Sequence, residues 1–61
     1  MNVERLKSIM KEKGIKKGEL ARAIGVSGAF VTYILSGFKT PSVPVLKRMA
    51  DFLGVSADEL I

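Results

Sequence analysis

Cysteine and histidine are both absent from the chain, and these two absences exclude several kinds of covalent link and metal site. Without cysteine there is no disulfide framework, and without either residue the usual zinc sites are excluded. The six acidic residues are scattered along the sequence and form no convergent cluster. We therefore expect neither a metal-dependent nor a nucleophilic enzyme, and the sequence implies no cofactor and no metal.

Long apolar runs are absent as well. Hydrophobic residues fill 48% of the 61 positions, which is enough for a compact core, but charged residues interrupt them too often for a membrane span. No N-terminal apolar segment resembles a secretion signal, so we expect a cytoplasmic protein without a membrane partner. The length is near the lower limit for a core without disulfides or metal, and it predicts one domain over residues 1–61.

Basic charge is the main compositional feature that the chain does have. Ten Lys and Arg against six Asp and Glu give a net charge of +4, and the isoelectric point is near 9.8. Such a charge favours polyanionic partners. Alone it is weak evidence, because many small domains are modestly basic.

The segment Glu19–Gly37 has the pattern of two short helices joined by a tight turn. Gly25 can end the first helix in a left-handed conformation without a Cβ clash. Ser27 can cap the next helix by accepting a hydrogen bond from a free backbone N–H. Ala21 is small enough for a close helix crossing, and Val31 can fill that crossing. This spacing is typical of a helix-turn-helix.

Capping residues and apolar spacing predict helices throughout the first two thirds of the chain. Asn2 can cap a helix over Val3–Lys13, and Gly14 ends it. A second helix begins near Lys17, and a third runs from about Gly28 to Ser36. No strand-like alternation, internal repeat or low-complexity linker is present.

Two further helices are predicted after the loop that follows Gly37. Ser42 is the expected N-cap of the fourth helix, and Gly54 ends it. Its expected buried stripe consists of Val43, Leu46, Met49, Ala50 and Leu53. Ser56 and Glu59 form a capping box that opens a short fifth helix. The prediction is an all-α fold, a compact bundle of five short helices containing a helix-turn-helix.

Short motifs between Arg5 and Leu60 occur in an order that few families share. They are Arg5-Leu6-Lys7, Lys11-Glu12-Lys13-Gly14, Glu19-Leu20-Ala21, Gly25-Val26-Ser27, Gly37, Pro41-Ser42, Leu53-Gly54-Val55-Ser56 and Asp58-Glu59-Leu60. Through them the whole chain resembles the Cro/C1-type helix-turn-helix family of phage repressors and bacterial regulators. The resemblance implies a lambda-repressor-like fold. It also implies sequence-specific binding to double-stranded DNA, usually as a symmetric homodimer on a palindromic operator, to repress or activate transcription.

The third helix would face the major groove in such a protein. The resemblance implies base contacts by Gly28, Ala29, Thr32 and Tyr33. The family often carries Gln, Arg, Asn or Ser at these positions, which can bond base edges directly. This chain offers few such groups, and two interpretations remain open. Either the helix reads thymine methyls and DNA shape with modest specificity, or it has lost base readout and its apolar surface binds a protein, such as a toxin or another repressor.

Phosphate contacts are expected on both sides of the third helix. Lys16 and Lys17 lie at the start of the second helix, where side-chain charge and free N–H groups can hold a phosphate. Lys39 follows the third helix. A single lysine is more often a solvated surface charge, but two clusters flanking one helix favour DNA contact. The complete expected set is Lys16, Lys17, Ser27, Ser36, Lys39 and Thr40.

The third-helix position Leu35 departs from the family pattern together with Met10. The family commonly has Glu and Arg there, joined in a partly buried ion pair, whereas both residues are apolar here. The joint change predicts that Met10 and Leu35 touch in the core, because packed apolar groups can replace such a pair without loss of stability.

Exposed apolar residues leave further alternatives open. Phe38, in the loop after the third helix, either covers the end of that helix or presses on a DNA sugar. A second apolar set either forms a two-fold dimer patch or packs within the chain against the short fifth helix. Its members are Val45, Phe52, Leu60 and Ile61.

Overall fold

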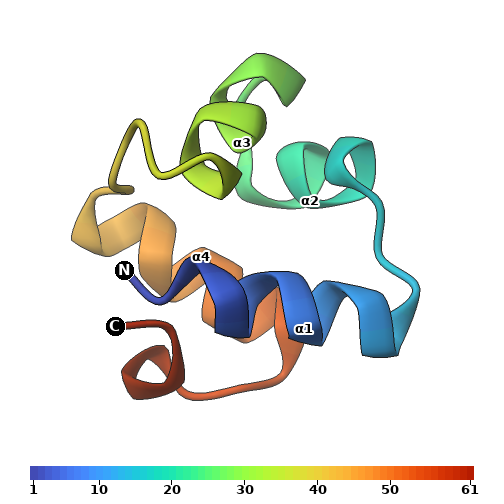
Figure 1. The fold of residues 1–61 in the computed structure, drawn as a ribbon, viewed down its shortest axis with the longest axis vertical. Coiled ribbons are helices and arrows are strands. Elements are labelled where there is room, and N and C mark those ends of the chain that lie inside the picture. The colour runs from blue at the N-terminus through green and yellow to red at the C-terminus, as the bar shows by residue number, and fades with distance from the viewer.

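The computed structural model describes residues 1–61 and consists of helices joined by short loops (Figure 1). The elements are α1 (Val3–Lys13), α2 (Lys17–Ile24), α3 (Gly28–Leu35), α4 (Val43–Leu53) and the 3₁₀ helix η1 (Ala57–Leu60). The elements α2 and α3 lie on one side of the pair α1 and α4, and η1 lies on the other side (Figure 1). None of the helices has the length and apolar character needed to cross a membrane.

The predicted boundaries of α1 and α4 are confirmed. The Asn2 side-chain oxygen accepts a hydrogen bond from the Arg5 backbone N–H at 3.0 Å, and Gly14 ends α1. Ser42 occupies the N-cap position of α4, but its side chain makes no capping bond. Helix α3 ends at Leu35, one residue earlier than expected, and Ser36 is its C-cap.

The predicted count of five helices is not confirmed, because the last element is a single 3₁₀ turn. The Ile61 N–H donates to the Asp58 carbonyl at 3.4 Å, a bond between residues three apart. The Glu59 N–H likewise donates to the Ser56 carbonyl at 3.1 Å, so the bonds have the 3₁₀ spacing and not the four-residue spacing of an α-helix. The Glu59 part of the predicted capping box does form, since its carboxylate accepts from the Ser56 N–H at 3.3 Å.

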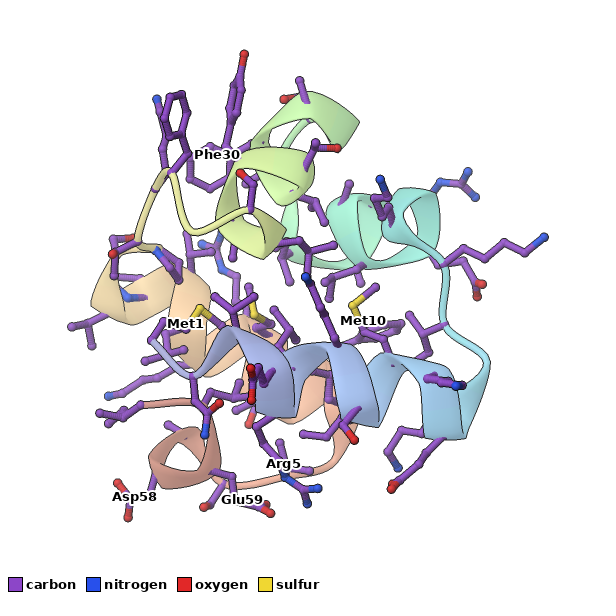
Figure 2. All side chains as sticks on the ribbon, viewed as in Figure 1. Met1, Arg5, Met10, Phe30, Asp58 and Glu59 are labelled. Atoms are coloured by element: carbon purple, nitrogen blue, oxygen red, sulfur yellow. The ribbon has the colours of Figure 1, made fainter.

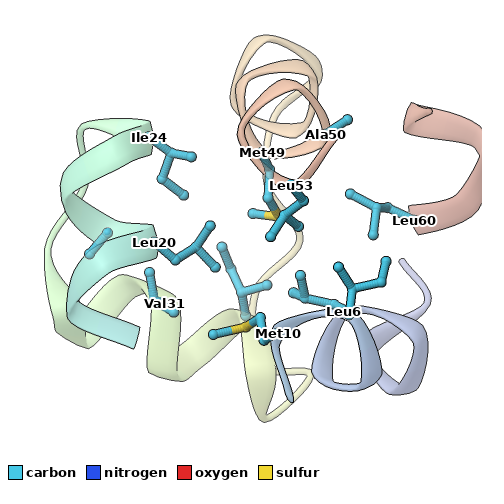
Figure 3. Packing of buried hydrophobic residues seen from close by; sticks show 12 residues of the cluster. Leu6, Met10, Leu20, Ile24, Val31, Met49, Ala50, Leu53 and Leu60 are labelled. Atoms are coloured by element: carbon cyan, nitrogen blue, oxygen red, sulfur yellow. The ribbon is translucent and has the colours of Figure 1, made fainter. Parts of the chain in front are cut away.

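Twelve apolar side chains from all five elements form the core (Figure 3). They are Leu6, Ile9, Met10, Leu20, Ala21, Ile24, Val31, Ile34, Met49, Ala50, Leu53 and Leu60. Half-buried apolar residues, including Leu35, pack against this cluster. Helices α1 and α3 contact each other, which agrees with the expected Met10–Leu35 contact but does not test the pair itself.

Two residues are placed differently from the sequence prediction. Val43 was expected in the buried stripe of α4 but is 64% exposed, because it is the first residue of the helix and projects beyond the core. Leu60 was a candidate for a dimer surface but is fully buried. It lies in the core with residues of α1 and α4 (Figure 3).

The 3₁₀ turn is tied to α1 by polar contacts near both termini. The Asn2 N–H donates to the Leu60 carbonyl at 2.8 Å. Arg5 donates to the Glu59 carboxylate at 3.0 Å, and the two side chains lie close together in Figure 2. The pKa of Glu59 lies below its ordinary value of 4.5. The largest cause is the hydrogen bond from Arg5, and the hydrogen bond from the Ser56 N–H lowers the pKa further.

Candidate nucleic-acid interface

Helices α2 and α3 pack against each other with the turn that the sequence predicts. Gly25 has φ of 74°, in the left-handed region that favours glycine. The Val26 N–H then donates to the Ala21 carbonyl at 3.0 Å, which fixes the chain as it leaves α2. Ala21 and Val31 are both buried at this crossing. The helix-turn-helix arrangement is therefore confirmed.

One face of α3 is exposed along its whole length. It carries Gly28, Ala29, Thr32 and Tyr33, all solvent-exposed, whereas Val31 and Ile34 on the opposite face are fully buried. The structure thus brings together the four residues for which base contacts were expected. Whether they touch bases remains a prediction.

Thr32 offers less hydrogen bonding than its sequence position suggested. Its hydroxyl donates to the Gly28 carbonyl one turn earlier in α3, at 3.1 Å. The hydroxyl hydrogen is therefore engaged within the helix, and only oxygen lone pairs and the methyl group face outward. In this conformation Thr32 can accept a hydrogen bond from a base or contact a thymine methyl.

Ser27 and Ser36 lie at opposite ends of α3 and differ in what they can offer a phosphate. The Ser27 hydroxyl oxygen accepts from the Phe30 N–H at 3.1 Å, so its hydrogen stays free to donate. The Ser36 hydroxyl donates to the Tyr33 carbonyl at 3.0 Å. Only Ser27 therefore retains a hydroxyl donor suited to a phosphate oxygen in this conformation.

The start of α2 combines two lysines with a carboxylate. Lys16 and Lys17 are exposed there, as expected. However, the Glu19 carboxylate accepts from the Lys16 backbone N–H at 3.2 Å. This bond occupies one of the free N–H groups and places a negative charge where a phosphate was expected. A phosphate contact at α2 must therefore depend mainly on the lysine side chains.

The loop after α3 reverses through a Schellman motif centred on Gly37, which has φ of 80°. The Gly37 N–H donates to the Ile34 carbonyl at 3.1 Å, and the Phe38 N–H to the Tyr33 carbonyl at 2.9 Å. The Lys39 N–H bonds the same Tyr33 carbonyl at 3.2 Å. The backbone of Lys39 is thereby fixed next to the end of α3, and Thr40 follows it in the exposed loop.

Two aromatic rings lie beside the Lys39 ammonium, an arrangement that was not predicted from the sequence. The Lys39 Nζ lies 5.8 Å from the centre of the Phe30 ring and 5.9 Å from that of Tyr33, within the range of cation–π attraction. The Tyr33 and Phe38 rings are 6.1 Å apart. A sequence signal did exist, because an apolar residue directly after a C-terminal glycine often packs onto the last helical turn.

The net charge of the protein comes from one stretch of the chain, which contains α3. Residues 20–50 contain Arg22, Lys39, Lys47 and Arg48 and no acidic residue. This stretch therefore carries a charge of +4, equal to that of the whole chain, while the remaining acidic and basic residues balance. The loop after α3 lies on one side of that helix and α2 lies on the other (Figure 1). The lysine groups at Lys16–Lys17 and at Lys39 thus flank α3.

The four residues of the candidate dimer patch do not form one surface. Leu60 is buried, whereas Phe52 and Ile61 are 42% and 72% exposed. Phe52 lines a shallow hollow with Glu19, Arg22 and Ala23. Ile61 lines a separate hollow, together with Met1 and Leu46 among others. Val45 is half-buried and packs against the core.

Fold and surface together define a small helix-turn-helix domain with a basic, aromatic third-helix face. A family model for helix-turn-helix proteins matches residues 6–60, and the chain belongs to this family of Cro/C1-type proteins. It is also similar to a Bacillus subtilis (strain 168) protein named "Uncharacterized HTH-type transcriptional regulator YazB". The two are 36% identical over 56 residues, which cover 92% of this chain and 81% of that protein. No solved structure matches the chain. The family is one of DNA-binding regulators and not of enzymes.

Proposed function

We propose that this protein is a transcriptional regulator of repressor type that binds double-stranded DNA with α3 in the major groove. The main supporting observation is the exposed face of α3, which is flanked by lysines and lies within a 31-residue stretch free of acidic groups. Family membership supports the same class of partner. In this proposal Lys16, Lys17, Ser27, Lys39 and Thr40 contact phosphates. The protein acts in the cytoplasm, where its DNA target would be accessible.

Base readout in this proposal depends on methyl groups and DNA shape. Ala29 and the Thr32 methyl contact thymine methyls, and Tyr33 adds a ring face and one hydroxyl. Because directional bonds are few, the preferred site is rich in A·T pairs. Each wrong base pair should cost about 1 kcal/mol, the lower end of the usual range.

The protein binds as a homodimer to a palindromic operator in the same proposal. Two half-sites would then lie about 34 Å apart, one helical turn, on one face of the duplex. Phe52 and Ile61 are the most exposed members of the candidate dimer set. Ile61→Asp should separate a dimer that forms through the hollow lined by Ile61. Sedimentation of the protein–duplex complex in the analytical ultracentrifuge measures the stoichiometry.

Selection from a random duplex library tests the proposal, because it reports binding, sequence and symmetry together. The expected outcome is an A·T-rich inverted repeat with weak discrimination at each position. Enrichment of no duplex would contradict DNA binding. A G·C-rich site with steep discrimination would contradict the proposed mode of readout.

A protein-interaction module that kept the fold but lost base readout is the second candidate. The observation that favours it is the exposed aromatic surface of Tyr33 and Phe38, 43% and 82% exposed. Tyr33→Ala separates the two candidates. In the DNA-binding proposal it relaxes base preference and leaves the non-specific affinity that the lysines supply. In the alternative it abolishes a protein complex and has no effect on DNA.

A further inference from the structure

The backbone of Phe38 is hydrogen-bonded to the end of α3, yet the residue is 82% exposed. The Schellman motif fixes its backbone through the 2.9 Å bond to the Tyr33 carbonyl. A residue at this place commonly packs on the last turn of the helix, which would account for the Tyr33–Phe38 ring contact at 6.1 Å. With so much of the ring uncovered, that contact uses little of its surface. Folding alone therefore does not explain a phenylalanine here.

The surroundings of Phe38 combine apolar ring surface with positive charge. The next residue, Lys39, holds its ammonium 5.8 Å and 5.9 Å from the Phe30 and Tyr33 ring centres. This places the charge beside the exposed face of α3. The nearest acidic residues along the chain are Glu19 and Asp51. An uncovered ring next to a positioned cation complements a ligand that presents an apolar face beside an anion.

The DNA backbone has this combination, since each deoxyribose presents an apolar face next to a phosphate. We propose that Phe38 packs against a deoxyribose adjacent to the phosphate that Lys39 binds. The loop after α3 thereby contacts one DNA strand at the C-terminal end of that helix. This inference rests on the proposed DNA binding and adds a contact that is neither base readout nor an ion pair. Apolar packing and ion pairing respond differently to salt, which makes the two separable.

The test measures the affinity of purified protein for the selected duplex by fluorescence anisotropy across a series of salt concentrations. Phe38→Ala should weaken binding about tenfold at every salt concentration, because it removes apolar contact, and should leave the salt slope unchanged. Lys39→Ala should lower the slope by about 0.9. Phe38→Leu should recover most of the affinity. Val3→Ala is the matched control, since it trims a half-buried apolar residue at the start of α1 that lines neither hollow and lies outside the proposed contact.

Thermal unfolding of each variant separates binding from folding, and Phe38→Ala should melt within a few degrees of the wild type. If the wild type binds the duplex and Phe38→Ala binds equally well, the sugar contact is wrong while the proposed function stands. If the wild type binds no duplex at all, the proposed function itself fails, and this inference with it.

A ribonucleotide scan locates the contact. A 2′-hydroxyl introduced at one operator position places a polar group on the sugar against which Phe38 would pack. At one position per half-site, the substitution should weaken wild-type binding and should not further weaken Phe38→Ala. Equal losses for both proteins at every position would overturn the proposal.

Discussion

Thr32 illustrates how one hydrogen bond within the protein decides what a single residue can offer to DNA. Because its hydroxyl donates to the Gly28 carbonyl at 3.1 Å, the methyl group is the part best placed to contact a base. A matched pair of substitutions tests this. Thr32→Val keeps the methyl and should bind the selected duplex within about twofold of the wild type, whereas Thr32→Ser should bind about fourfold more weakly, the value of one buried methyl. The opposite order, with Val much the weaker binder, would assign the contact to the hydroxyl.

The Met10 and Leu35 pair is a second prediction at this scale. Met10 is 7% exposed, and Leu35 is half-buried against the same core. Leu35→Glu should lower the free energy of unfolding by roughly 2 kcal/mol, because it brings an unpaired charge to the core edge. Adding Met10→Arg should recover much of that loss by creating an ion pair. Denaturant unfolding of the two single variants and the double variant measures the coupling, and strictly additive losses would show that the side chains do not meet.

At the scale of elements, the boundaries were predictable where a local residue fixes them. Asn2, Gly14 and Gly25 act on neighbouring backbone groups, so their effect could be inferred from the sequence and is confirmed. The type of η1 was not predictable from its capping box. The same first turn opens an α-helix or a 3₁₀ helix, so the capping box alone does not decide between them.

The other differences between the sequence prediction and the structure come from how the elements pack together. Val43 has the spacing of a buried residue, but its place at the very start of α4 puts it beyond the core. Leu60 was a surface candidate because periodicity could not show that η1 folds back onto α1 and α4. The placement of the Lys39 ammonium beside two rings was not predicted because it requires the loop to return to α3, which depends on the hydrogen bonds to the Tyr33 carbonyl.

Replacing each of two glycines by alanine should change the free energy of unfolding in opposite directions. Neither Gly18 nor Gly37 would place a Cβ within 4 Å of another group, so the backbone conformation alone decides the outcome. Gly37 has φ of 80°, and Gly37→Ala should lower the free energy of unfolding by about 1 kcal/mol. Gly18 lies within α2, and Gly18→Ala should raise that free energy by about 0.5 kcal/mol. Thermal unfolding measures both, and a shift of the same sign in the two variants would contradict this explanation of the loop.

The attachment of η1 to α1 gives a pH prediction. The Arg5 hydrogen bond lowers the pKa of Glu59 from its ordinary 4.5, so the ionised carboxylate stabilises the folded state. That stabilisation is present above the ordinary pKa and disappears as the pH falls through the lowered value. Glu59→Gln should therefore be slightly less stable than the wild type at pH 7, and the difference should vanish in acid. The effect is small because the pair is solvated, and a difference independent of pH would contradict it.

At the scale of the whole molecule, the distribution of charge along the chain says more about the partner than the net charge does. A net charge of +4 is modest, but residues 20–50 carry all of it. This positive stretch contains α3 and the loop after it, so its charge favours a polyanionic partner for that part of the protein. Composition predicted a polyanionic partner only weakly, and the acid-free stretch that contains α3 was not part of that prediction.

The salt dependence of duplex binding tests this account most directly. Log Kd for the selected duplex should rise linearly with log salt concentration in the wild type, and Lys17→Ala and Lys39→Ala should each reduce the slope by about 0.9. Lys11→Ala removes the same charge from α1, outside the expected set of phosphate contacts, and should leave the slope unchanged. No duplex binding even at low salt, or the same slope in all three variants as in the wild type, would contradict the claim that the α3 face binds DNA.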